Sequence, residues 1–103
     1  MTADADVQVW LETMERTRPV VVVPYVVSEN ARGVQYRIRA VQDAAGGGRA
    51  VIGQKGEIQL QAKTPAALSR FSLQRRPGDH CEIEIILEGG DMRKRHFVFE
   101  CPS

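Results

Sequence analysis

Two cysteines, Cys81 and Cys101, are the residues of this chain with the clearest capacity for covalent chemistry. If the strands on either side of Gly89-Gly90 pair as a hairpin, both thiols lie near its far end, where a disulfide could form in an oxidising compartment. The alternative is two independent, partly buried thiols, because cysteine packs well as a small hydrophobic residue. The chain has no Cys-x-x-Cys, so a thioredoxin-type redox role has little support.

Neither a metal site nor a hydrolytic site has the spacing that its chemistry needs. Five side chains with nitrogen or sulfur atoms could be imagined around a soft metal: His80, Cys81, Met92, His96 and Cys101. Their spacings match no regular zinc or copper pattern. Ser69 and Ser72 also lack the context of a nucleophile elbow. We therefore expect no bound metal, no cofactor and no hydrolytic activity.

Glu82 and Glu84 project from one face of a predicted strand, as a pair of catalytic carboxylates could. In a sheet, such residues usually pair with basic residues on the neighbouring strand. Arg37 and Arg39 are the natural partners here, so the sequence favours a structural role for the glutamates. We expect that the protein is not an enzyme.

The basic residues are the remaining candidates for function. The chain has 14 basic and 13 acidic residues, and its net charge of +1 argues against a generic nucleic-acid binder. The charges are segregated, however, since residues 31–63 hold six basic residues against Asp43 and Glu57, whereas residues 1–15 hold only acidic ones. The basic candidates are Arg37, Arg39, Arg49, Lys55, Arg93, Lys94 and Arg95. They could form a solvated face with weak ion pairs, or a cationic surface that captures an acidic, unfolded partner.

Residues 66–88 show most clearly which elements must position these side chains. Two segments alternate between apolar and polar residues around Pro77-Gly78-Asp79, as in a half-buried antiparallel sheet. In the first, Phe71 and Leu73 share a face opposite Arg70, Ser72 and Gln74. In the second, Cys81, Ile83, Ile85 and Leu87 share a face opposite Glu82 and Glu84.

The rest of the chain also predicts strands. Residues 7–11 alternate as in a strand, and Val20–Val27 is typical of a fully buried strand that Pro24 interrupts with a bulge or places at an edge. Residues 34–41 form the next strand, with Val34, Tyr36, Ile38 and Ala40 pointing inward. A flexible glycine-rich loop follows at residues 43–48, then one or two short strands at 49–61. Gly89-Gly90-Asp91 makes a hairpin turn into a last strand, Met92–Cys101.

About seven short strands with regularly spaced turns predict an all-β fold, an immunoglobulin- or fibronectin-III-like antiparallel β-sandwich. The length fits one domain spanning residues 1–103, with residues 1–6 as a flexible N-terminal tail. No run approaches the ~18 apolar residues of a membrane helix, so we expect a soluble protein without membrane insertion.

From Val34 to Phe99 the chain resembles the periplasmic inhibitors of curli amyloid assembly, the CsgC/CsgH-like chaperones of Gram-negative bacteria. The resemblance rests on Arg37-Ile38, the Gly46–Gly48 loop, Lys55–Leu60, Pro65–Leu73, Pro77-Gly78-Asp79 and the strand Glu82–Glu88. The enterobacterial branch carries a Cys-x-Cys where this chain has Val34-Gln35-Tyr36. Redox ideas attached to that motif do not transfer, and the departure points to the CsgH-like branch.

The resemblance implies a monomeric periplasmic chaperone, with its signal peptide removed, that inhibits amyloid nucleation of the unfolded major curli subunit. In that family a positive surface is thought to meet an acidic client. Arg37 and Arg39 are then the first choices for client contact, followed by Arg49, Lys55 and Lys94. The alternatives are a generic adhesive β-sandwich module and a thiol-redox or metal-handling periplasmic protein built on the two cysteines.

Overall fold

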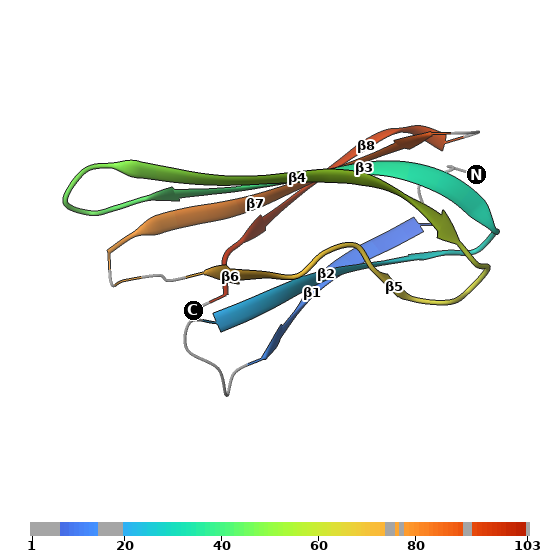
Figure 1. Ribbon diagram of the computed structural model, residues 1–103, viewed down its shortest axis with the longest axis horizontal. Helices are drawn as coiled ribbons and strands as arrows, with labels where there is room; N and C mark the ends of the chain where they lie inside the picture. Colours follow the sequence, from blue (N-terminus) through green and yellow to red (C-terminus); the bar gives the residue numbers. More distant parts are fainter. Residues whose placement is uncertain (1–6, 15–19, 74–75, 77, 90–91, 103) are drawn as a thin grey trace.

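The chain folds into two four-stranded antiparallel sheets packed face to face (Figure 1), as a computed structural model shows. The structure describes residues 7–14, 20–73, 76, 78–89 and 92–102. Its strands are β1 (Val7–Met14), β2 (Val20–Ser28), β3 (Arg32–Asp43), β4 (Arg49–Leu60), β5 (Ala66–Ala67), β6 (Phe71–Leu73), β7 (His80–Gly89) and β8 (Met92–Glu100). The predicted all-β sandwich is confirmed.

The two sheets have different strand orders. One sheet has the order β1-β2-β5, with β6 also paired to β2, and the other has the order β4-β3-β7-β8. Among the described residues no helix is long or apolar enough to cross a membrane. The expected flexible tail at residues 1–6, the predicted outward strand residue Gln74 and the predicted turn residues Pro77, Gly90 and Asp91 lie outside the described part.

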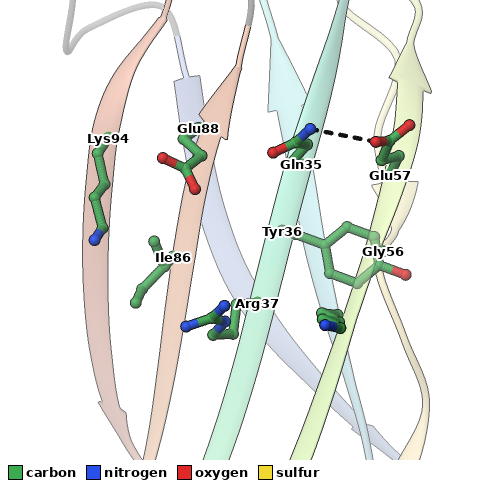
Figure 2. Close-up of a pocket in the computed structure, with 9 residues that line it drawn as sticks. Gln35, Tyr36, Arg37, Gly56, Glu57, Ile86, Glu88 and Lys94 are labelled. Carbon is green, nitrogen blue, oxygen red and sulfur yellow. Dashed lines mark hydrogen bonds between the residues drawn. The ribbon is translucent and has the colours of Figure 1, made fainter.

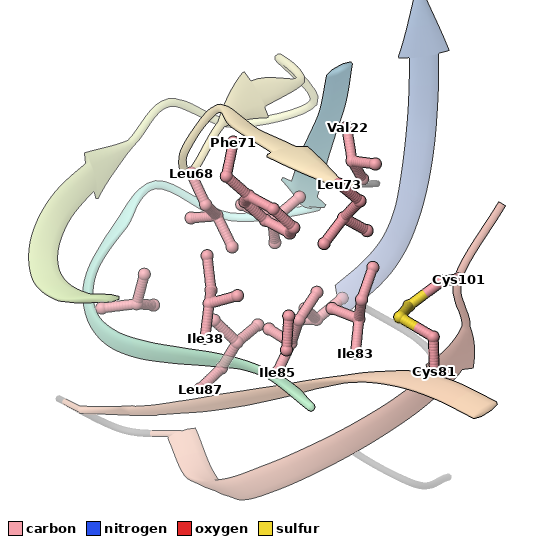
Figure 3. Packing of buried hydrophobic residues seen from close by; sticks show 14 of the residues in the cluster. Val22, Ile38, Leu68, Phe71, Leu73, Cys81, Ile83, Ile85, Leu87 and Cys101 are labelled. Atoms are coloured by element: carbon pink, nitrogen blue, oxygen red, sulfur yellow. A yellow bond between two sulfur atoms is a disulfide. The ribbon is translucent and has the colours of Figure 1, made fainter. Parts of the chain in front are cut away.

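The core lies between the sheets and is built by side chains that alternate along each strand (Figure 3). On β7 every second residue from Cys81 to Leu87 is almost fully buried, as the sequence predicts. Val34, Ile38 and Ala40 of β3 face the same layer, and Tyr36 is half-buried beside them. Phe71 and Leu73 of β6 close the core from the opposite sheet. Period-two patterning therefore decided which residues are inside.

Pro24 neither bulges its strand nor places it at an edge, and that prediction was wrong. β2 pairs with β1 in continuous register from Val21 to Ser28, and it lies inside its sheet. On its other side the neighbouring strand is split, with β6 pairing before Pro24 and β5 pairing after it. A proline has no N–H to donate to such a ladder. Its carbonyl is used instead and accepts a hydrogen bond from the Leu68 N–H at 2.8 Å.

The expectation that Val20–Val27 is fully buried was also wrong. Alternate residues of β2 are buried, while those between them, such as Tyr25, are half-buried on the outer face. There the rings of Tyr25 and Trp10 stack with their centroids 5.7 Å apart. This contact covers apolar surface that the second sheet does not reach.

The two segments around residues 77–79 do not pair with each other. β6 joins the sheet of β2, whereas β7 pairs with β3 and β8 in the other sheet. For the described residues of both segments the inward and outward faces are as predicted, but the connection crosses between sheets. Face is a local property of each strand, whereas the pairing partner depends on distant parts of the chain.

Residues 49–60 form one long strand rather than the one or two short strands expected around Gly53 and Gly56. All twelve residues of β4 pair with β3 in unbroken register. The glycine-rich loop is a turn in which the Gly47 N–H donates to the Ala44 carbonyl at 3.0 Å. Gly56 has a packing role, since a Cβ there would lie 2.7 Å from the Tyr36 hydroxyl oxygen.

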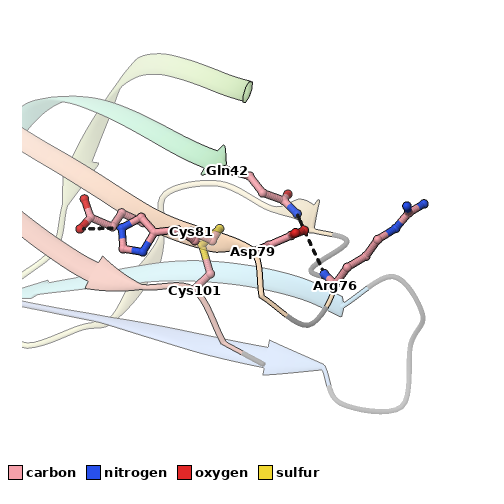
Figure 4. Close-up of a disulfide and its surroundings, with 7 residues drawn as sticks. Gln42, Arg76, Asp79, Cys81 and Cys101 are labelled. Atoms are coloured by element: carbon pink, nitrogen blue, oxygen red, sulfur yellow. Dashed lines mark hydrogen bonds and ion pairs between the residues drawn. A yellow bond between two sulfur atoms is a disulfide. The ribbon is translucent and has the colours of Figure 1, made fainter. Parts of the chain in front are cut away.

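Cys81 and Cys101 are joined by a disulfide at the open end of the β7–β8 hairpin (Figure 4), with their Cα atoms 5.4 Å apart. The Cys101 N–H also donates to the Cys81 carbonyl at 3.1 Å, which extends the ladder past the end of β8. Both residues are almost fully buried. The bond therefore fastens the end of the last strand to the core.

Asp79 ties together two connections at the same end of the molecule (Figure 4). Its carboxylate accepts hydrogen bonds from the Gln42 side chain at 3.0 Å and from the backbone N–H groups of Ala45 and Arg76, each at 3.1 Å. The side-chain bond from Gln42, followed by the two backbone bonds, lowers the pKa of Asp79 below its ordinary value of 3.8. The ionised form is therefore favoured in the folded state.

Asp79→Asn is expected to lower the Tm at neutral pH, because an amide cannot accept hydrogen bonds from all three donors. A carboxyl group with a lowered folded-state pKa stabilises the fold above pH 3.8 and loses that effect as the pH falls through the folded pKa. The Tm difference between wild type and variant should therefore shrink below about pH 4. Thermal unfolding followed by circular dichroism between about pH 7 and 2 measures it. Glu100→Gln, which removes an exposed carboxylate of β8, is the control. A Tm difference between wild type and Asp79→Asn that stays constant over this pH range would contradict the prediction.

Candidate functional site

The basic residues singled out in the sequence lie on the outer face of the β4-β3-β7-β8 sheet. Arg37 pairs in register with Lys55 of β4, and Arg39 follows two residues later on the same face. All three side chains are exposed. No hydrogen bond or ion pair joins any of them to another residue in the described part of the chain. Their charges are therefore available to a partner.

Lys94 of β8 joins this group across the sheet. Arg37, Lys55 and Lys94 line one open depression together with Ile86 and Glu88 of β7 (Figure 2). Gln35, Tyr36, Gly56 and Glu57 complete its lining. The sequence separates Lys94 from Arg37 by 57 positions, so only the strand order β4-β3-β7-β8 brings them to one surface. We call Arg37, Arg39, Lys55 and Lys94 the cationic face.

Arg49 lies on the same side of β4 but apart from the cationic face. Lys55 lies six positions further along the strand, which corresponds to about 20 Å in an extended chain. Its guanidinium contacts the Asp43 carboxylate, with Nε to Oδ1 at 2.7 Å and Nη2 to Oδ2 at 3.3 Å. This hydrogen bond lowers the pKa of Asp43 and raises that of Arg49. The contact holds Arg49 at the base of the hairpin turn, which weakens its case for client contact.

The expected pairing of Glu82 and Glu84 with Arg37 and Arg39 was wrong. Arg39 does lie opposite Glu84 in the ladder, but no ion pair within 4 Å joins either arginine to a described residue. The glutamates contact histidines instead. Glu84 Oε2 lies 3.1 Å from Nε2 of His96, and Glu82 Oε1 lies 3.5 Å from Nε2 of His80. Both contacts are on exposed surface, where a long arginine side chain gains little from a fixed pair.

The non-basic residues of the depression were not predicted from the sequence. Ile86 faces outward, opposite Arg37, although its neighbours Ile85 and Leu87 are buried. The Gln35 side chain of β3 donates a hydrogen bond at 3.2 Å to the carboxylate of Glu57, which lies directly opposite it on β4. The run Ile85-Ile86-Leu87 could have predicted an outward isoleucine, because in an alternating strand with Ile85 and Leu87 inside, the middle residue must point away from the core.

The described residues hold no group of three His, Cys, Asp or Glu side chains that could bind a metal ion. The two cysteines considered for redox chemistry are bonded to each other and about 2% and 4% exposed. Their burial keeps external thiols away from both sulfur atoms, and access is a requirement for thiol–disulfide exchange. The outer face instead presents exposed basic and polar side chains around one open depression.

Comparison with protein families gives a match over residues 1–96 to the Tafi-CsgC family, thin aggregative fimbriae synthesis protein. This chain belongs to the Tafi-CsgC family. The match covers all strands up to β7 and part of β8, including the whole cationic face. The resemblance seen in the sequence is thereby confirmed, and with it a role related to curli.

Two solved structures share the fold of this Tafi-CsgC protein. The E. coli curli protein CsgC, in a SeCys form, superposes with a TM-score of 0.76 at 19% identity, covering 90% of this chain and 97% of CsgC. The R. palustris CsgH solution structure gives a TM-score of 0.72 at 14% identity, with 91% of each chain covered. No curated protein sequence matches the chain significantly.

Proposed function

We propose that this domain is a periplasmic chaperone that delays amyloid nucleation of the major curli subunit before its secretion. The observation that carries the proposal is the cationic face on a member of a thin aggregative fimbriae synthesis family. Its three arginine and lysine side chains on β3 and β4 have no ion-pair partner among the described residues. The partner is the unfolded subunit, and the domain acts as a monomer without a cofactor.

A cationic sheet surface suits this task because it attracts an acidic, disordered chain from a distance without binding it tightly. Exposed ion pairs contribute about 0–1 kcal/mol each, so four basic residues give weak, reversible contact. Screening at physiological salt acts over about 8 Å, so the attraction depends on ionic strength. Weak contact is sufficient if the chaperone meets rare nuclei, and it leaves the client free to be secreted. The disulfide is consistent with an oxidising compartment such as the periplasm.

The experiment that tests the proposal is amyloid growth of purified major curli subunit, followed by dye fluorescence. The domain is added at a small fraction of the client concentration. A long delay before growth supports the chaperone function. Normal growth even at equal concentration would contradict it and would leave an interaction module with another partner.

Arg37→Glu combined with Arg39→Glu is expected to abolish most of the delay while leaving the Tm nearly unchanged. The reason is that both side chains are exposed and form no hydrogen bond or ion pair with a described residue, so the main effect is to reverse the attraction to the client. Lys63→Glu with Arg70→Glu is the matched control, since it makes the same change in net charge away from the cationic face. Equal loss of inhibition by both double variants would show that net charge matters rather than this surface.

A further inference from the structure

In the β4-β3-β7-β8 sheet, the edge of β4 is less protected than the edge of β8 against pairing with another chain. β4 is twelve residues long and, in the described part of the chain, pairs with β3 alone, so its other side presents backbone groups without a strand partner there. The segment Ala50–Gln54 carries no charge and lies between Arg49 and Lys55. Within it Val51 and Ile52 are 50% and 36% exposed. In Figure 1 this part of the β3–β4 hairpin extends beyond the ends of β2 and β6.

The opposite edge of the same sheet is built differently. β8 carries four consecutive basic or imidazole side chains from Arg93 to His96, and its register with β7 shifts between Leu87 and Gly89. Charged side chains and bulges are the usual protection of edge strands against unwanted pairing. The uncharged segment of β4 has neither, and its register with β3 is unbroken. The β4 edge therefore lacks both kinds of protection and can pair with the strand of a partner.

Charge complementarity selects the partner. A second copy of this chain that paired antiparallel and centred on Ile52 would place its Arg49 opposite Lys55, and like charges directly opposed destabilise a sheet. An extended segment with an uncharged centre and acidic residues at its ends would instead be attracted at Lys55, whereas Arg49 at the other end is already paired with Asp43 and contributes less. Arg37 lies beside Lys55 on the outer face and would add to that attraction.

We propose that the edge of β4 at Ala50–Gln54 accepts an extended acidic segment of the client as an additional strand of the sheet. This inference rests on the proposed chaperone function, because it names how that client is held. Backbone hydrogen bonds supply the contact, and Lys55 with its neighbour Arg37 favours acidic sequences. A client strand paired in this way is unavailable for addition to a growing amyloid edge.

The test uses the whole domain and two synthetic peptides, read by amide hydrogen exchange in NMR spectra. The first peptide has nine residues, with valine and threonine at its centre and two aspartates at each end. The second has the same sequence with every valine and threonine N-methylated, which keeps the charge but removes the backbone donors. At saturating concentration the first peptide should slow about tenfold the hydrogen exchange of those backbone amides in Ala50–Gln54 that point away from β3. The second peptide should leave them unchanged, and neither should protect the β8 edge.

Protection by both peptides alike, or protection at β8 instead of β4, would overturn the inference. Chemical-shift changes confined to the side chains of Arg37 and Lys55 would also overturn the inference, because they would show a charge contact without strand addition. The assay contains no amyloid, so it separates the two proposals. Delayed amyloid growth without β4 protection rejects only the binding mode, whereas β4 protection without delayed growth rejects only the chaperone function.

Discussion

Phe71→Ala is expected to lower the free energy of unfolding by about 3–5 kcal/mol, because it leaves a cavity between the two sheets. Phe71 is 7% exposed and pairs in register with Val22 of β2. It belongs to a strand of three residues, so few neighbouring contacts can compensate for its loss (Figure 3). A domain of this size has a total stability of about 5–15 kcal/mol, so the variant would be marginally folded.

Urea unfolding followed by circular dichroism measures this change, since the midpoint falls with stability at constant slope. Ser72→Ala is the matched control, because Ser72 is the next residue of the same strand and faces outward. Its stability should stay within about 0.5 kcal/mol of the wild type. If Phe71→Ala were equally harmless, Phe71 would not lie in the core and β6 would have the opposite face inward.

Replacing Cys81 and Cys101 together by alanine is expected to cost about 3 kcal/mol of stability. The two residues are 20 positions apart, and a cross-link over a loop of that length restricts the unfolded chain by roughly this amount. The loop encloses the whole β7–β8 hairpin, which holds the most deeply buried strand of the core. The cationic face does not depend on the bond, so inhibition of amyloid growth should persist at temperatures where the variant is folded.

Thermal unfolding of the wild type with and without reductant gives the same comparison without a substitution. The reduced protein and the double variant should melt at similar temperatures, both well below the oxidised protein. Thiol titration of the unfolded, unreduced wild type should detect no free thiol. Detection of two free thiols, or equal melting of oxidised and reduced protein, would contradict a stabilising disulfide.

The faces of the strands could be predicted from the sequence, because side-chain direction in a strand alternates locally. The buried set from Cys81 to Leu87 and the outward position of Arg37 and Arg39 both follow from a period of two. The hairpin of β7 and β8 was also predictable, since its strands are adjacent and joined at glycine residues. These local features were sufficient for the fold class and for the basic residues of interest.

Pairing between distant strands could not be predicted, because it depends on packing over the whole domain. The short connection between β6 and β7 is compatible with a hairpin, but β6 pairs with β2 in the other sheet, from which Phe71 and Leu73 are buried in the core. The split of β5 and β6 around Pro24 likewise depends on the strand that lies beside that proline. A twelve-residue β4 contradicts the weak local preference of Gly53 and Gly56 because continuous pairing with β3 outweighs it.

Local alternation and the family resemblance were enough to predict a β-sandwich with arginines on an outer face. The grouping of the basic residues could be seen only in the folded structure. The strand order placed Lys94 beside Arg37 and Lys55, and the register placed Arg49 against Asp43, apart from them. The physical reason is that a charge acts over a few ångströms through space, and distances between strands are set by the packing of the core rather than by separation along the chain.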